Sequence, residues 1–175
     1  MSDDKPTHQE RLKRFLQTEG KAGPPPKNEA DAEEAEVSGG GAFGYLRGIR
    51  DTPGSIEFRF RDGNSVWFAY SLLGTWRYNP SEGLLLKFSG DQIYLVLIRG
   101  SNLAKPLNEG AINLTSGGLQ RNRVVWIREM EDAAIRQVGD SGPTVDRIQI
   151  GEFESQAALK EWLGKNAPAF LPGEK

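Results

Sequence analysis

The chain contains no cysteine, and this absence removes several classes of protein at once. Without thiols there is no disulfide scaffold, no thiolate nucleophile and no sulfur-rich zinc site. Histidine is almost as rare, because His8 is the only one in 175 residues. A metal site would have to use oxygen ligands alone, and the acidic residues do not have the spacing of a calcium loop. We therefore expect neither a metal nor any other cofactor.

Long hydrophobic runs are also missing. The longest apolar stretch, Ile93–Ile98, has six residues, whereas a membrane-spanning helix needs about 20. Residues 1–10 are rich in charge and lack the apolar stretch of a secretion signal. We therefore expect a cytoplasmic protein without a membrane span.

The chain has little excess charge of either sign. Residues 43–151 carry 13 basic and 11 acidic side chains, a net charge of +2, whereas residues 1–42 carry 6 basic and 9 acidic ones. A segment so close to neutrality has no long-range field to attract nucleic acid or an anionic membrane. Recognition of either would have to depend on a local patch.

Residues 1–42 have the composition of a flexible, disordered arm. A capping-box pattern and helical spacing of apolar residues predict one short helix near residues 8–19. Three prolines at 24–26, a run of acidic residues and three glycines at 39–41 follow. Such a segment buries too little apolar surface to order itself, so we interpret it as a linker. Whether the short helix docks on the rest of the protein stays open.

From Phe43 onward, apolar and polar residues alternate between turn residues, which is typical of antiparallel sheet. About seven strands are predicted, near residues 43–50, 56–61, 65–70, 84–89, 92–98, 124–128 and 145–150. A helix near residues 155–165 follows, with an apolar stripe that contains Trp162. The segment 129–138 fits either a helix or a hairpin. We expect one mainly β domain over residues 43–167 and a C-terminal tail over 168–175.

In its order of elements, the segment 43–165 resembles the pleckstrin-homology-like superfold. That resemblance is architectural, and it implies a strongly bent antiparallel sheet closed at one end by the C-terminal helix. A partly open barrel of another topology and a β-sandwich remain alternatives. Because one fold hosts many functions, the resemblance does not identify a ligand.

The first predicted hairpin has a register that the sequence can specify. A three-residue loop, Asp62–Asn64, pairs Phe58 with Phe68 and separates an apolar face from a polar one. The third residue of such a loop adopts a left-handed conformation, which asparagine tolerates. This register places Arg59 directly across from Trp67 on the polar face.

The second predicted hairpin is closed by a two-residue turn, Gly90-Asp91, because glycine in first position suits a type II′ turn. This register pairs Phe88 with Ile93 and Lys87 with Tyr94. Both faces of the hairpin are apolar away from the turn. We therefore expect these two strands at the centre of the sheet, covered on both sides.

Two motifs resemble functional signatures but lack their context. Gly139–Pro143 resembles the segment around the nucleophile of chymotrypsin-like serine proteases, yet the only histidine that could serve as a base is His8. We interpret this segment as a turn. Gly39, Gly41 and Gly44 have the spacing of the dinucleotide-binding fingerprint, which requires a preceding strand and a following helix. An acidic linker precedes them, so we interpret them as a hinge.

The remaining signal is a set of basic and aromatic residues on or near predicted strands. The candidate binding residues are Arg59, Arg61, Trp67, Lys87, Tyr94, Arg121, Arg123 and Trp126. A cation over an aromatic ring contributes about 0.5–1 kcal/mol at an exposed site. Such a surface can grip an acidic peptide or stack a nucleic-acid base, and it can equally serve only to stabilise the sheet.

We therefore expect a non-catalytic intracellular module that binds a protein or peptide through a sheet face or edge. One alternative is a nucleic-acid-binding module that uses the arginine and tryptophan residues. The other is a hydrolase that uses a pair of carboxylates, for which the sequence singles out no pair. We predict no catalytic residue, and the sequence does not indicate an oligomeric state.

Overall fold

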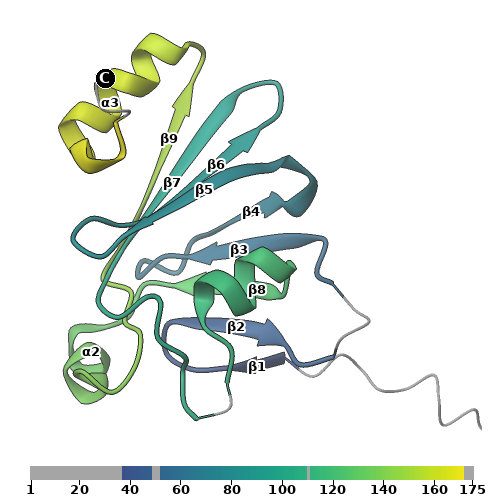
Figure 1. Cartoon of the computed structure of the whole chain (residues 1–175), viewed down its shortest axis with the longest axis vertical. Coiled ribbons are helices and arrows are strands. Elements are labelled where there is room, and N and C mark those ends of the chain that lie inside the picture. The colour runs from purple at the N-terminus through teal and green to yellow at the C-terminus, as the bar shows by residue number, and fades with distance from the viewer. Residues whose placement is uncertain (1–36, 49–51, 110, 172–175) are drawn as a thin grey trace, which may run out of the picture. The chain divides into compact units, whose positions relative to one another are not determined.

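The computed structural model describes residues 37–48, 52–109 and 111–171. Within these ranges the chain forms two β-sheets, one of five strands and one of four, and a C-terminal helix (Figure 1). This confirms the prediction of a mainly β fold that ends in a helix. The predicted helix near residues 8–19 lies outside the described residues.

The five-stranded sheet has the order β1-β2-β8-β3-β4. Its strands are β1 (Val37–Gly39), β2 (Phe43–Leu46), β3 (Ser55–Arg59), β4 (Ser65–Ala69) and β8 (Val124–Arg128). Neighbouring strands run antiparallel, except that β3 and β8 are parallel. Because β8 inserts between β2 and β3, the edges of this sheet are β1 and β4.

The four-stranded sheet has the order β5-β6-β7-β9, and all its neighbours are antiparallel. Its strands are β5 (Leu73–Asn79), β6 (Gly83–Ser89), β7 (Ile93–Arg99) and β9 (Arg147–Phe153). A 3-10 turn, η2 (Tyr70–Leu72), connects β4 to β5 and so carries the chain from one sheet to the other. We predicted neither β5 nor β1 from the sequence.

The two sheets pack against each other through aromatic side chains. The rings of Phe68 on β4 and Phe88 on β6 are stacked, with centroids 4.6 Å apart. Phe58 on β3 meets both rings edge-on, at 5.9 and 6.2 Å. All three side chains are buried, and burying an aromatic of this size stabilises the fold by about 1.5–3 kcal/mol. No closed barrel forms among the described strands.

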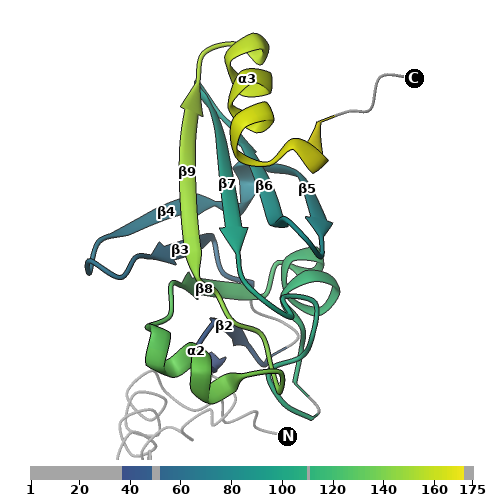
Figure 2. The ribbon, with the colours of Figure 1, turned by 90° about the vertical axis from the view of Figure 1, so that its left-hand side faces the viewer.

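A second core cluster lies on the other face of the four-stranded sheet. Leu85, Leu95 and Leu97 from β6 and β7 contact helix α3 (Gln156–Asn166) and the short turn η5 (Pro168–Phe170). Figure 2 shows α3 lying beside one end of this sheet. The prediction that β6 and β7 are covered on both sides is confirmed. The resemblance to the pleckstrin-homology-like superfold is not confirmed, because the strand order and the parallel β3–β8 pair depart from a simple antiparallel meander.

The described structure extends past the predicted domain boundaries at both ends. Strand β1 lies inside the segment that we predicted as a flexible arm, and it pairs with β2. At the other end, Phe170 is buried in the second cluster, and its carbonyl accepts a hydrogen bond from the Arg77 guanidinium at 2.9 Å. Packing therefore includes residues that we assigned to a tail.

The segment between β7 and β9 carries the irregular elements. These are η3 (Leu114–Gly118), η4 (Leu119–Arg121) and the short helix α2 (Asp132–Val138). The choice left open for residues 129–138 is thus decided in favour of a helix. Gly139–Pro143 forms turns and bends after α2, as predicted.

The first hairpin has a loop of three residues, as predicted, but these are Arg61–Gly63 rather than Asp62–Asn64. The Phe60 N–H donates to the Asn64 carbonyl at 2.9 Å, and the Gly63 N–H donates to the Phe60 carbonyl at 3.2 Å. The residue with positive φ is Gly63, at 86°, and not Asn64. Glycine takes this position because it has no Cβ to oppose a left-handed backbone.

This displacement of the loop by one residue moves each cross-strand pair by two positions. Phe58 now lies opposite Val66, and the apolar and polar faces stay separated because the side-chain period of a strand is also two. The partner of Trp67 is Glu57, not Arg59. The predicted Arg59–Trp67 pair is therefore wrong.

The second hairpin is closed by three residues, Gly90–Gln92, and not by the predicted two-residue turn. Phe88 lies opposite Tyr94, and Lys87 lies opposite Leu95. The predicted Lys87–Tyr94 pair is therefore wrong, and the two side chains lie on opposite faces of the sheet. Because both faces of this hairpin are apolar, the sequence pattern could not discriminate between the two registers.

Candidate functional site

A row of residues crosses the outer face of the five-stranded sheet. Strand pairing places them side by side on adjacent strands, in the order Gly39, Gly44, Trp126, Glu57 and Trp67. Residues in one such row point to the same face of the sheet. Two of the predicted binding residues, Trp67 and Trp126, therefore share a face, with one strand between them.

Trp126 lies between two arginine side chains. The guanidinium carbon of Arg59 is 4.8 Å from the centre of the indole, and that of Arg128 is 5.4 Å away. Arg59 and Arg128 are neighbours in the parallel β3–β8 pairing. A cation–π contact between Arg59 and a tryptophan thus exists, but the ring belongs to Trp126.

The two glycines of the row make room for Trp126. An added Cβ at Gly39 would lie 2.9 Å from the indole Cζ2, and one at Gly44 would collide with the indole Nε1. Two neighbouring glycines are also packed, since a Cβ at Gly40 would meet Leu107 and one at Gly41 would meet Met130. The interpretation of this glycine motif as a hinge is therefore wrong. Its glycines allow close packing around the β1–β2 turn.

The charge of Arg59 is compensated within its own strand. Its guanidinium contacts the Glu57 carboxylate through Nε at 2.8 Å and Nη2 at 2.7 Å. The hydrogen bond from Arg59 lowers the pKa of Glu57 below the ordinary value of 4.5, and partial burial opposes this shift. The face around Trp126 is consequently less cationic than the sequence suggested.

The outer side of β4 presents backbone groups to no described neighbour. Backbone hydrogen bonds join Phe60 to Asn64 at one end of the β3–β4 ladder and Tyr70 to Gly54 at the other, so both are hydrogen-bonded pairs. Hydrogen-bonded and non-hydrogen-bonded pairs alternate in an antiparallel ladder. The N–H and C=O groups of Ser65, Trp67 and Ala69 therefore point away from β3, and in the described part of the chain no backbone group accepts or donates to them.

Exposed apolar side chains gather at this edge. Within the described ranges, the large hydrophobic side chains that are exposed are Trp67 (61%), Val37 (48%), Leu72 (39%) and Val66 (38%). Three of these four lie on β4 or in the turn that follows it. Edge strands of natural proteins are usually protected by charged residues, proline or a bulge. The β4 sequence Ser-Val-Trp-Phe-Ala contains neither charge nor proline, and its pairing with β3 shows no bulge.

Several predicted binding residues lie elsewhere and hold the structure together. Arg61 forms an ion pair with Asp132 at 3.0 Å, at the tip of the first hairpin. Arg123 donates two hydrogen bonds to the Leu46 carbonyl, at 2.8 and 2.6 Å, and one to the Arg47 carbonyl at 2.6 Å. Both arginines thus connect distant segments of the chain.

The other predicted residues are also dispersed. Tyr94 is half-buried on the core face and donates to Glu152 at 3.2 Å, while Lys87 is half-buried on the opposite face. Arg121 is exposed in η4 and makes no ion pair or hydrogen bond to another described residue. The structure therefore brings Arg59, Trp67 and Trp126 together and separates the remaining five.

Sequence reasoning missed Val66, Leu72 and Arg128 as members of this surface. The uncharged stretch around Val66 was visible in the sequence. Its significance depends on β4 being an edge, and strand order is a property of the tertiary structure. Arg128 was missed because the parallel β3–β8 pair joins segments about 70 residues apart.

Comparison with known proteins gives no match. No protein-family profile, curated protein or solved structure is similar to this chain. In the part of the chain that the structure describes, no group of three histidine or acidic residues is arranged to hold a metal ion. No helix there has both the length and the apolar character that a bilayer span requires.

Proposed function

We propose that this protein is an interaction module that binds an extended segment of a partner protein as an additional strand beside β4. The observation that carries the proposal is the unprotected β4 edge, where outward backbone groups coincide with exposed Val66, Trp67 and Leu72. An exposed, apolar edge strand that stays unpaired is an aggregation hazard. Such an edge is therefore suited to pairing with a strand of a partner protein.

Backbone hydrogen bonds supply part of the expected affinity. Ser65, Trp67 and Ala69 each offer one N–H and one C=O to an incoming strand. Each bond contributes a net of about 0.5–1.5 kcal/mol. An antiparallel or parallel partner strand can use these groups, because both kinds of ladder read every second residue of the edge.

Side chains define the chemistry of the partner segment. Trp67 is a large exposed aromatic of the kind that dominates binding energy at protein interfaces. β4 has no charged side chain, and Glu57 and Arg59 on the neighbouring strand β3 already pair with each other. The complementary segment is therefore extended and uncharged, with apolar or aromatic residues at alternate positions to cover Trp67 on one face and Val66 on the other.

The test begins with ten-residue peptides selected from a random display library against the full chain. The best peptide is then titrated into ¹⁵N-labelled protein, and hydrogen exchange of the backbone amides is followed by NMR. We expect slowed exchange of the outward N–H groups of Ser65, Trp67 and Ala69. Peptides that bind elsewhere, or a library without a binder, would contradict the proposal.

Ala69→Pro is a sharp variant for this test. Ala69 has φ −65°, which is the angle that proline requires, and its N–H points away from β3. The substitution therefore keeps the fold but blocks the edge, and we expect peptide affinity to fall about tenfold or more. The control is Arg121→Ala, which should leave affinity unchanged. If the chain is instead a dimer that Ala69→Pro dissociates, a second copy occupies the edge and the proposed partner segment is wrong.

The two alternative functions receive less support. A nucleic-acid base would have to stack on Trp126, but Arg59 and Arg128 already lie over that ring. Binding of single-stranded oligonucleotides that weakens steeply with salt would favour this alternative. A carboxylate-pair hydrolase has no buried pair among the described residues, where the buried polar side chains are those of Thr115 and Thr144. We keep the cytoplasm as the proposed compartment on the sequence grounds given above.

A further inference from the structure

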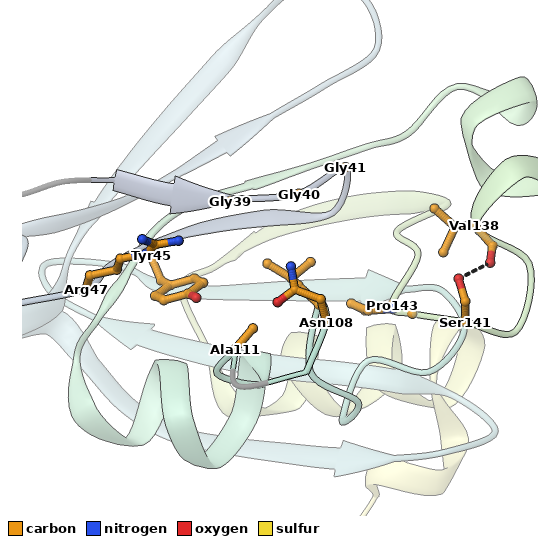
Figure 3. A pocket seen from close by; sticks show the side chains of 12 residues that line it. Gly39, Gly40, Gly41, Tyr45, Arg47, Asn108, Ala111, Val138, Ser141 and Pro143 are labelled. Carbon is orange, nitrogen blue, oxygen red and sulfur yellow. Dashed lines mark hydrogen bonds between the residues drawn. The ribbon is translucent and has the colours of Figure 1, made fainter.

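The two glycine-containing motifs of the sequence meet at a pocket of about 240 Å³ (Figure 3). Gly39–Gly41 forms one wall and Ser141–Pro143 another. The Ser141 hydroxyl donates to the Val138 carbonyl at 2.6 Å. In the described part of the chain, every buried side-chain nitrogen and oxygen has a hydrogen-bond partner. No buried polar group of this pocket therefore calls for a ligand.

A different surface lies where β4 crosses the four-stranded sheet. The Phe68 ring of β4 stacks on Phe88 of β6 at 4.6 Å and meets Tyr94 of β7 edge-on at 5.2 Å. Strand pairing puts Phe88, Tyr94 and Glu152 in one row across β6, β7 and β9, on the face towards β4. Figure 2 shows β7 and β9 continuing past β4 towards α3. The cover that β4 provides for the four-stranded sheet thus ends close to this row.

The row is only partly covered. Phe88 is fully buried, Tyr94 is half-buried and Glu152 is exposed. Leu72, which is 39% exposed, lies next to the β6–β7 turn, 3.7 Å from the place of a Cβ on Gly90. We call the surface formed by Leu72, Tyr94 and Glu152 the corner. It adjoins the outward edge of β4, with which no described strand pairs.

The corner carries negative charge. Burial raises the pKa of the Tyr94 hydroxyl above its ordinary value of 10.0, and so do the hydrogen bond to Glu152 and the charges of Glu152 and Asp91. Among the described residues, neither carboxylate takes part in an ion pair. Glu152 accepts a hydrogen bond from Tyr94 at 3.2 Å, and a carboxylate has room for several. The corner therefore suits a hydrogen-bond donor and repels an acidic side chain.

A strand paired with β4 would carry side chains to this corner. Neighbouring strands lie about 4.8 Å apart, so the inward side chains of an added strand stand about that far beyond Phe68. This places them within reach of the Tyr94 ring, which is 5.2 Å from Phe68. Aromatic rings pack favourably with centroids about 4.5–7 Å apart. Tyrosine and tryptophan combine such a ring with an uncharged hydrogen-bond donor.

We propose that the partner segment anchors in the corner through one tyrosine or tryptophan, whose ring packs against Tyr94 and whose O–H or N–H donates to Glu152. This inference rests on the proposed function, because the anchor reaches the corner from a strand that is paired with β4. The anchor lies on the same face of the sheet as Val66, and its two neighbours in the partner segment lie on the face of Trp67. The charges of Asp91 and Glu152 disfavour an acidic residue at the anchor position.

The experiment uses the ten-residue peptides selected from the random display library against the full chain. We expect tyrosine or tryptophan at one fixed position of the binders. In the best peptide, phenylalanine in place of the anchor should weaken binding about two- to tenfold, because an aromatic ring stays and the donor is lost. Alanine there removes the ring as well and should weaken binding by about thirtyfold or more. Isothermal titration calorimetry measures both, and neither change alters the protein.

Glu152→Gln assigns the hydrogen bond to a named acceptor. In this variant the original and the phenylalanine peptide should differ by about twofold or less, because the charged acceptor is already missing. Glu109→Gln is the matched control, since Glu109 is exposed and makes no contact of this kind with a described residue. The difference between the two peptides should be the same in this control as in the parent protein. An equal difference in Glu152→Gln would exclude Glu152 as the acceptor.

Hydrogen exchange at Ser65, Trp67 and Ala69 separates the failure of this inference from the failure of the proposed function. Peptides that protect these amides but bind equally well with phenylalanine or alanine at every inward position would overturn the anchor and leave strand pairing in place. Peptides that leave these amides unprotected, or a library without a binder, would overturn both.

Discussion

The indole of Trp126 occupies the space that a side chain at position 44 would need, because an added Cβ on Gly44 would collide with Nε1. An added Cβ on Gly39, on the next strand, would lie 2.9 Å from Cζ2 of the same ring. The ring thus packs on the backbone of two strands, and Arg59 and Arg128 lie over it. Trp126 is consequently part of the framework of the sheet, whereas Trp67, which lies beyond Glu57 in the same row, is exposed.

Replacing Gly44 by alanine should destabilise the protein. Because the added methyl group would collide with the packed indole of Trp126, we expect the free energy of unfolding to fall by about 1–3 kcal/mol. Gly48→Ala is the matched control, since nothing lies within 4 Å of an added Cβ there, and its effect should stay within about 0.5 kcal/mol. Urea denaturation followed by tryptophan fluorescence measures both. Equal stability of the two variants would contradict the packing described for Gly44.

The two tryptophans of the outer face should differ sharply in their contribution to stability. Trp126→Ala removes a half-buried ring that contacts two glycines and two arginines, and we expect a loss of about 2–3 kcal/mol. Trp67 is 61% exposed, so Trp67→Ala should change stability by less than about 0.5 kcal/mol. Thermal unfolding by circular dichroism compares them. A large loss in Trp67→Ala would show that this side chain is already packed inside the protein.

Tyr70 should make stability decrease in alkaline solution. Its hydroxyl donates to the Val124 carbonyl at 2.9 Å, and burial raises its pKa above the ordinary value of 10.0. Since the folded state favours the protonated form, this contribution is complete below pH 10 and is lost as pH rises through the raised pKa.

The test of Tyr70 compares Tyr70→Phe with the parent protein. At neutral pH the variant should be less stable by about 0.5–1.5 kcal/mol, because one hydrogen bond is missing. Above pH 10 this difference should shrink, because the parent protein then loses the stabilising contribution of the protonated Tyr70 hydroxyl, which the variant lacks at every pH. Tyr78→Phe serves as the control, because the Tyr78 hydroxyl bonds to no described residue. Urea denaturation across this pH range measures the effect, and a constant difference would refute it.

Glu57 should act in the opposite pH direction. Its pKa is lowered below 4.5, mainly by the hydrogen bond from Arg59. The carboxylate therefore stabilises the fold above pH 4.5, and this contribution disappears as pH falls through the lowered pKa. Because the Arg59 side chain is 37% exposed, solvent screening limits the effect to less than about 1 kcal/mol. An NMR titration of the Glu57 carboxyl should give a higher pKa in Arg59→Met than in the parent protein, and identical values would exclude the pair as the cause.

The hairpins show how far a sequence pattern can fix register. Phe58 and Val66 alternate with polar neighbours, so the pattern correctly separated the faces of the first hairpin. It could not place the loop, because both Gly63 and Asn64 tolerate a left-handed backbone and the two choices give the same faces. In the second hairpin both faces are apolar. No pattern of polar residues could therefore select the register in which Phe88 pairs with Tyr94.

The candidate site was harder to predict from the sequence than the fold was. The predicted importance of Trp67 and Trp126 came from residue type, and the structure does place both on one face. The predicted pairing of Arg59 with Trp67 was wrong, because β8 brings Trp126 to the other side of β3.

By itself the sequence determined that this protein is mainly β, that β6 and β7 lie at the centre of a sheet and that a helix with an apolar stripe follows the last strand. These properties follow from periodicity and turn chemistry, which act over a few residues. Only the tertiary structure decided that β8 inserts beside β3 and that β4 is left as an edge. These outcomes depend on contacts between distant segments, and such contacts are selected by the packing of the whole core rather than by any local pattern.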